Sequence, residues 1–202
     1  MAPTKFWPLV LVVALFGCST SPDPATPNKE AAAPTVASNA VTLNAAQQAQ
    51  LQTGISQLEQ KDYSSAAATL ATLPSADALY MAAVANYRLG QTAPSKALLE
   101  QALTTQPAHA PSLNLRALLA REQGLFRQAE TDWLAAIAAD PNFAAAERNL
   151  GILYDIYLAN PQQARLHYQR YFELSNDEQA KVWLSALPAA TDAAEPVQES
   201  KP

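Results

Sequence analysis

Cysteine is almost absent from this 202-residue chain, and Cys18 is its only example. A lone cysteine cannot form an intramolecular disulfide, so the fold does not depend on an oxidising compartment. Histidine is nearly as scarce: His109 and His167 stand 58 residues apart, with no cysteine in the folded part to join them in a metal site. No H-E-x-x-H, G-x-S-x-G or phosphate-binding glycine loop occurs. We therefore expect no enzyme activity, no metal and no bound cofactor other than a covalent lipid.

Positive charge is also in short supply. The chain has 13 Lys and Arg against 18 Asp and Glu, a formal net charge of −5. An acidic balance argues against nucleic acid as a partner, because the phosphate backbone is bound through Lys and Arg. It equally argues against a polybasic patch that holds the protein on an anionic membrane.

Long hydrophobic runs are missing except near the start, where an apolar run extends from Leu9 to Phe16. This run is too short to span a bilayer but has the length of a signal-peptide core. The sequence Leu15-Phe16-Gly17-Cys18 that closes it resembles the bacterial lipobox, with Phe16 bulkier than that motif prefers. The resemblance implies a signal peptide over residues 1–17, lipidation of Cys18 and an outer-membrane lipoprotein facing the periplasm. The alternative is an ordinary signal peptide with an incidental cysteine.

Bulky apolar residues are scarce in two further segments. Residues 18–42 contain four prolines between positions 22 and 34, and residues 188–202 have a similar composition. Such segments cannot bury enough apolar surface to offset their chain entropy. We expect a disordered tether in the first and a disordered tail in the second.

Between these segments, residues typical of helix ends and of close helix packing recur at a fixed interval. Gly90 to Gly124, Ala102 to Ala136 and Pro107 to Pro141 are each 34 residues apart. The pattern continues with Glu147-x2-Leu150-Gly151-x2-Tyr154 and then Ala164-x3-Tyr168. This period and these marks resemble the tetratricopeptide repeat, although Glu147 stands where that pattern prefers Trp. The resemblance implies an all-α solenoid of helix–turn–helix units.

We expect this repeat domain to cover residues 43–187. The expected units are 43–75, 76–109, 110–143 and 144–176, followed by a capping helix over 176–187 that opens with a capping box of Ser175 and Glu178. The first unit is five residues short, and the fourth has one residue inserted near Ala159-Asn160-Pro161. The four glycines after Cys18 all fall at the packing position of a first helix or at the turn between two helices.

Aromatic residues gather in the fourth unit. We assign Tyr154 and Tyr168 to the core because they occupy pattern positions, and Trp133 and Trp183 likewise. Tyr157 and Phe172 are not required by the pattern and are candidates for contact with a partner.

The resemblance also implies where function lies, because the first helix of each unit lines the concave surface on which such domains bind segments of other proteins. The positions that map to this groove include Tyr80, Tyr87, Arg88, Asn114, Arg121, Arg148 and Asp155. We expect Arg88, Arg121 and Arg148 to form an oblique basic strip that pairs with Asp or Glu of a partner; the alternative is that they are ordinary solvated helix residues.

The function we expect is a protein–protein interaction scaffold anchored in the cell envelope. The chain is similar to pilus-assembly and pilotin-type tetratricopeptide lipoproteins, and adaptors for cell-wall enzymes are an open alternative. A rival of another class is an envelope enzyme or small-ligand receptor, which would need a closed pocket with converging titratable groups.

Overall fold

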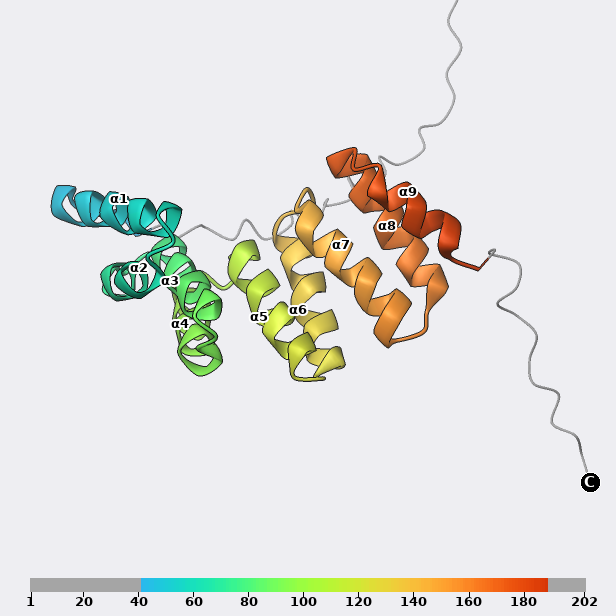
Figure 1. Ribbon diagram of the computed structural model, residues 1–202, viewed down its shortest axis with the longest axis horizontal. Helices are drawn as coiled ribbons and strands as arrows, with labels where there is room; N and C mark the ends of the chain where they lie inside the picture. Colours follow the sequence, from blue (N-terminus) through green and yellow to red (C-terminus); the bar gives the residue numbers. More distant parts are fainter. Residues whose placement is uncertain (1–40, 189–202) are drawn as a thin grey trace, which may run out of the picture. The chain divides into compact units, whose positions relative to one another are not determined.

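The computed structural model describes residues 41–188. The expected signal peptide 1–17, Cys18, most of the tether 18–42 and the tail beyond Pro188 lie outside these described residues. Within them the chain forms helices and no strand (Figure 1). The elements in chain order are α1 (Ala45–Glu59), α2 (Tyr63–Leu70), α3 (Ala76–Arg88), α4 (Thr92–Thr105), α5 (Ala110–Glu122), α6 (Phe126–Ala139), α7 (Ala144–Ile152), the π-helix η1 (Leu153–Tyr157), α8 (Pro161–Ser175) and α9 (Gln179–Ala186).

These helices pack as consecutive pairs, which confirms the expected all-α helix–turn–helix repeat architecture. The closest packing is within the pairs α5/α6, α3/α4 and α7/α8, and α2 packs as closely on α3 as on α1. Each second helix also contacts the first helix of the following pair, and the first helices α1, α3, α5 and α7 contact one another in sequence. The last helix, α9, packs on α8. The contacts are therefore with near neighbours along the chain, as in a solenoid.

Glycine takes the two roles expected from its positions. Gly90 and Gly124 follow α3 and α5 with φ of 73° and 75°, in the left-handed region that suits the turn between paired helices. Gly54 and Gly151 are buried instead, where the paired helix approaches closely. A Cβ at Gly54 would meet the side chain of Leu70, and a Cβ at Gly151 would meet the ring of Tyr168. Both pairs of glycines thus allow paired helices to turn tightly or to approach closely.

The core is built from the facing sides of these pairs. Leu70, Leu99, Leu119 and neighbouring alanines fill it in the first half, and Trp133, Leu150 and Tyr168 fill it in the second. Leu118 packs against both clusters, so the core runs on from one unit to the next. Trp133 is fully buried, and Tyr154 and Tyr168 are buried too, as expected. Trp183 of α9 is half-buried and packs on Tyr168 with ring centroids 5.1 Å apart.

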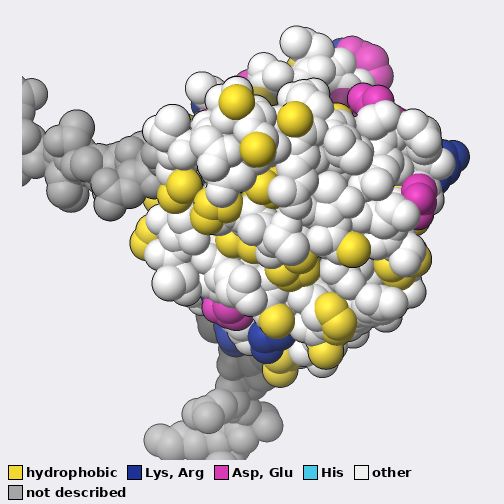
Figure 2. Space-filling view, turned by 90° about the vertical axis from the view of Figure 1, so that its left-hand side faces the viewer, with side chains coloured by type: hydrophobic (Ala, Val, Ile, Leu, Met, Phe, Trp, Pro, Cys, Tyr) yellow, Lys and Arg dark blue, Asp and Glu magenta, His cyan; other side chains and the backbone are white. Residues whose placement is uncertain are grey.

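At the amino-terminal end, α1 has an uncharged outer face. Its sequence holds five glutamines and no charged residue before Glu59. Figure 2, which faces this end of the molecule, shows hydrophobic side chains scattered among polar and backbone atoms, with charged side chains mainly toward the edges. Amide side chains and Asn44, which forms a capping box with Gln47, therefore make this end of the stack polar.

The start of α9 differs from the expected capping box. Ser175 is still inside α8, where its hydroxyl donates to the Tyr171 carbonyl at 2.7 Å, and Asn176 ends that helix in the left-handed region with φ of 54°. Asp177 then accepts the Gln179 N–H at 3.0 Å. Because α8 runs to Ser175, the expected pair of Ser175 and Glu178 does not form. The last helix begins at Gln179 rather than at residue 176.

Candidate functional site

The first helices of consecutive pairs are joined to one another by side-chain hydrogen bonds. The Tyr87 hydroxyl of α3 donates to Glu122 of α5 at 2.6 Å. The Asn149 amide of α7 donates to Asn114 of α5 at 2.8 Å. We call the first helix of each pair helix A, and the surface formed by the side chains of α3, α5, α7 and η1 the helix-A face. The sequence-predicted groove residues belong to these elements, so the face is the place to test them.

Two of the expected groove residues, Asn114 and Tyr80, make contacts within the protein that hold its helices together. The Asn114 carbonyl oxygen accepts from the Trp133 indole at 2.9 Å as well as from Asn149, so it ties α5 to both α6 and α7. The Tyr80 ring is half-buried and meets the edge of His109, with ring centroids 5.8 Å apart, and burial raises its pKa. Both residues position the helices and offer little to a partner.

Arg88 and Arg121 lie close to one hydroxyl group. The hydrogen bond to Glu122 raises the pKa of Tyr87, burial raises it further, and the positive charges of Arg121 and Arg88 oppose that rise. Both guanidinium groups are therefore near enough to act electrostatically on the Tyr87 hydroxyl.

Arg148 is in a different electrostatic setting. It is exposed near the start of α7. Hydrogen bonds from the Tyr171 hydroxyl and the Gln179 N–H lower the pKa of Asp177, and the charge of Arg148 lowers it further. The charge of Arg148 thus lowers the pKa of Asp177, which precedes α9, whereas the charges of Arg88 and Arg121 lower the pKa of Tyr87.

Arg121 is held against aromatic rings. Its guanidinium carbon lies 6.0 Å from the Trp133 ring centroid and 5.8 Å from that of Tyr157. Tyr157 in turn packs on Phe126, with centroids 4.9 Å apart. Both distances are within the range of cation–π attraction, which orients the guanidinium. Phe126 and Trp133 belong to α6, so sequence reasoning about the first helices alone did not include them in the site.

Asp155 does not face the groove. Its carboxylate accepts the Tyr168 hydroxyl of α8 at 3.2 Å. The cause is the π-helix Leu153–Tyr157, whose wider turn takes up the extra residue of the fourth unit inside the first helix. The spacing of the sequence predicts the insertion near Ala159–Pro161, and the π-helix shows that this prediction is wrong. The extra residue turns Asp155 toward α8 and leaves Ile156 66% and Tyr157 44% exposed.

Phe172, the other aromatic candidate for partner contact, is half-buried on α8 and lies under the Lys181 ammonium, which is 4.8 Å from its ring centroid. It contacts α9, so it is separate from the Arg121 cluster. Tyr157 is the aromatic candidate that shares a surface with the predicted arginines.

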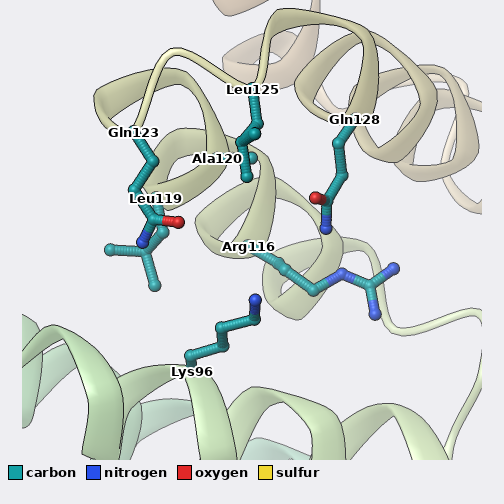
Figure 3. A pocket seen from close by; sticks show the side chains of 7 residues that line it. All are labelled: Lys96, Arg116, Leu119, Ala120, Gln123, Leu125 and Gln128. Carbon is teal, nitrogen blue, oxygen red and sulfur yellow. The ribbon is translucent and has the colours of Figure 1, made fainter.

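Hollows among the described residues do not resemble a substrate pocket. Figure 3 shows one of them, bounded by Lys96 of α4, Arg116 of α5 and Gln128 of α6. Its cavity of about 10 Å³ holds a single water at most. Arg116 is already bound there, with its guanidinium 2.9 and 2.7 Å from the Asp132 carboxylate oxygens. Three larger hollows are open to solvent. Those of about 430 and 470 Å³ beside α2 and α4 are lined without any charged residue. One of about 310 Å³ between α4 and α5 is lined by Glu100 and Arg116, which form an ion pair with each other.

The two histidines have separate partners. His109 Nε2 lies 3.0 Å from Asp77, and His167 Nδ1 lies 2.7 Å from Glu147. Over residues 41–188 no three His, Cys, Asp or Glu side chains gather in a way that could hold a metal ion. In the same range, no helix is both long and apolar enough to cross a membrane.

Comparison with known proteins identifies the repeat. The family model described as tetratricopeptide repeat matches residues 48–75 and 77–109. The search of curated proteins gives no significant match.

Solved structures of low sequence identity share the fold. The structure titled for pilF of Pseudomonas aeruginosa is 22% identical with a TM-score of 0.62, over 69% of this chain and 66% of that one, so this chain spans slightly less than two thirds of its length. YrrB, titled as a TPR protein with an unusual peptide-binding site, is 19% identical with a TM-score of 0.58, over 70% and 75% of the two chains. MamA from Desulfovibrio magneticus RS-1 is 17% identical with a TM-score of 0.60, over 71% and 84%.

Proposed function

Because residues 41–188 carry the tetratricopeptide-repeat fold, with two units matched by the family model itself, we propose that this chain is a non-enzymatic scaffold that binds a partner protein on its helix-A face. The observation that carries the proposal is the combination, on that face, of hydrogen bonds between the first helices and exposed arginine, isoleucine and tyrosine side chains. Its first helices are joined to one another by the Tyr87–Glu122 and Asn149–Asn114 bonds, yet Arg88, Ile156 and Tyr157 remain exposed, and the Tyr157 ring lies against Arg121.

This combination suits recognition. A face that is held rigid before binding loses little conformational freedom when a partner docks. Arginine and tyrosine are enriched among the residues that contribute most to protein–protein binding. YrrB, which shares the fold, is described as having a peptide-binding site. The absence of an enclosed polar pocket in the hollows described above favours this reading over an envelope enzyme or small-ligand receptor.

The proposal extends to the cell envelope. Lipidation of Cys18 would hold the protein at the periplasmic side of the outer membrane, with residues 19–42 as the link between lipid and repeat domain. A lipoprotein carries more than one acyl chain, which is the number needed for stable attachment. The likeness to the Pseudomonas aeruginosa pilF structure supports a role in assembling pili or secretion machinery, with cell-wall enzymes as alternative partners.

The proposal is tested by partner capture from detergent-solubilised envelopes. The variant combines Arg88→Ala, Arg121→Ala and Arg148→Ala in the full chain. Its matched control combines Arg127→Ala, Arg170→Ala and Lys181→Ala, which removes three cations that pair with a carboxylate three residues away. We expect the first variant to lose proteins that wild type and control both retain, and rising salt to release them from wild type. Equal recovery of every partner by both variants would contradict this function.

A further inference from the structure

Arg121 is a half-buried cation without a carboxylate partner. Among the described residues, Arg116, Arg127, Arg170 and Lys181 each form an ion pair, whereas Arg121 has no carboxylate oxygen within 4.0 Å over residues 41–188. Its guanidinium instead lies over the rings of Trp133 and Tyr157. Ring faces attract a cation but accept none of its five N–H donors in the way a carboxylate does.

Four carboxylates of the described residues are hydrogen-bonded to tyrosine hydroxyls. Tyrosine hydroxyls donate to them, and the four pairs are Tyr87–Glu122, Tyr154–Glu130, Tyr168–Asp155 and Tyr171–Asp177, with oxygen–oxygen distances of 2.6, 2.6, 3.2 and 2.6 Å. Glu122 adjoins Arg121 in sequence, yet it is bound to Tyr87 of the neighbouring helix. Arg88 adds a second positive charge near the same hydroxyl. Arg121 thus has no carboxylate acceptor among residues 41–188, although Glu122 keeps its negative charge in the bond to Tyr87.

An apolar surface adjoins this cation. The π-helix presents Ile156 and Tyr157, and Tyr157 contacts both Arg121 and Phe126. An anion at Arg121 would thus have exposed apolar side chains next to it. A guanidinium that aromatic rings already orient and partly desolvate forms stronger bonds to a carboxylate than a freely solvated one does.

We propose that the helix-A face binds a partner segment in which an Asp or Glu side chain pairs with Arg121 while a neighbouring apolar side chain packs on Ile156 and Tyr157. This inference rests on the proposed scaffold function and names the chemistry of its partner. Arg88 contributes long-range attraction and Arg121 the direct contact.

The test selects ligands without knowledge of the natural partner. Full-length protein in detergent micelles is presented with a phage-displayed library of random 12-residue peptides. Enriched peptides are synthesised with their Asp and Glu residues intact or changed to Asn and Gln, and their Kd is measured by fluorescence polarisation. The protein variants are Arg121→Gln, Arg121→Lys and Ile156→Ser, with Arg170→Gln as the control that removes a paired arginine of α8. Circular dichroism confirms that each variant is helical.

We expect the enriched peptides to place Asp or Glu beside an apolar residue. Arg121→Gln and the amide peptides should each weaken binding by about tenfold or more. Arg121→Lys should weaken binding less, because it keeps the charge but loses the planar fork, and Arg170→Gln should leave it unchanged. Peptides that bind Arg121→Gln as well as wild type, yet are weakened by Ile156→Ser, would overturn the anionic inference and leave the scaffold function standing. Enriched peptides that no helix-A-face change affects, or a library that yields none, would overturn both.

Discussion

A buried carboxylate pairs with a buried imidazole in the last repeat unit. Glu147 occupies the position where the repeat pattern prefers Trp, and it is only 5% exposed. His167 of α8 supplies its partner at 2.7 Å and also stacks on Tyr154, with ring centroids 5.4 Å apart. The polar pair thus fills, across α7 and α8, the space that a large apolar side chain fills elsewhere. The departure from the repeat pattern is matched by a compensating residue 20 positions later.

Removing one member of this pair should destabilise the protein strongly. Glu147→Ala leaves the His167 ring buried without its acceptor, and breaking a buried pair costs about 3–5 kcal/mol. Replacing both members with apolar residues, Glu147→Leu with His167→Phe, should cost much less than the single changes added together. Chemical denaturation of the four proteins in this double-mutant cycle measures both. An additive double mutant would show that the two side chains do not act as a pair.

Tyr154 gives the protein a dependence on alkaline pH. Burial and the hydrogen bond to Glu130 raise the pKa of Tyr154 from 10.0 to about 12. The folded state therefore holds this proton more tightly than the unfolded state, so the stabilisation is complete below pH 10 and is lost as the pH rises to about 12. Tyr154→Phe should make the fall in free energy of unfolding over this interval shallower, measured by denaturation at a series of pH values. An equally steep fall in the variant would assign the effect to other groups.

At the scale of helices, the sequence predicted the elements well, but it misplaced the start of the last helix and the position of one inserted residue. The 34-residue spacing of glycines, alanines and prolines was enough to predict how the helices pair. Each of these residues stands where the chain must turn or where two helices must approach closely. The same count showed one extra residue in the fourth unit but could not locate it. A loop near Ala159 and a π-turn within the first helix satisfy the spacing equally, and only packing against Tyr168 decides for the π-turn.

The close approach of α7 and α8 makes a testable contrast between two glycines. A Cβ at Gly151 would meet the stiff ring of Tyr168, whereas a Cβ at Gly54 would meet the more flexible side chain of Leu70. Overpacking costs roughly 1–3 kcal/mol, and the cost is larger where the neighbour cannot rotate away. We expect Gly151→Ala to lower the melting temperature more than Gly54→Ala does. The reverse order in a thermal scan would show that the α7–α8 contact relaxes more easily than its geometry indicates.

For the whole molecule, the sequence predicted only some of the residues of the candidate site. The repeat register placed Tyr87, Arg88 and Arg121 on first helices, and the charges of both arginines act on the Tyr87 hydroxyl. The rings beside Arg121 come from the second helix α6 and from the π-helix of the next unit, so no spacing within one helix could reveal them. The tyrosine–carboxylate bonds likewise join residues 6 to 35 positions apart, and spacing within one helix does not predict them.

The proposed membrane attachment depends on Cys18, which lies outside the described residues. If the lipobox-like sequence directs processing, Cys18→Ser should remove the acceptor thiol, so the precursor keeps residues 1–17 and takes up no labelled palmitate. The repeat domain over residues 43–187 contains no cysteine and should fold as before, with an unchanged helical circular-dichroism signal and melting temperature. The variant should also leave the outer-membrane fraction on density-gradient separation while still enriching the same displayed peptides as wild type. Labelling that persists in the serine variant would refute lipidation at this residue, whereas loss of labelling together with loss of peptide binding would mean that the lipid contributes to recognition as well as to attachment.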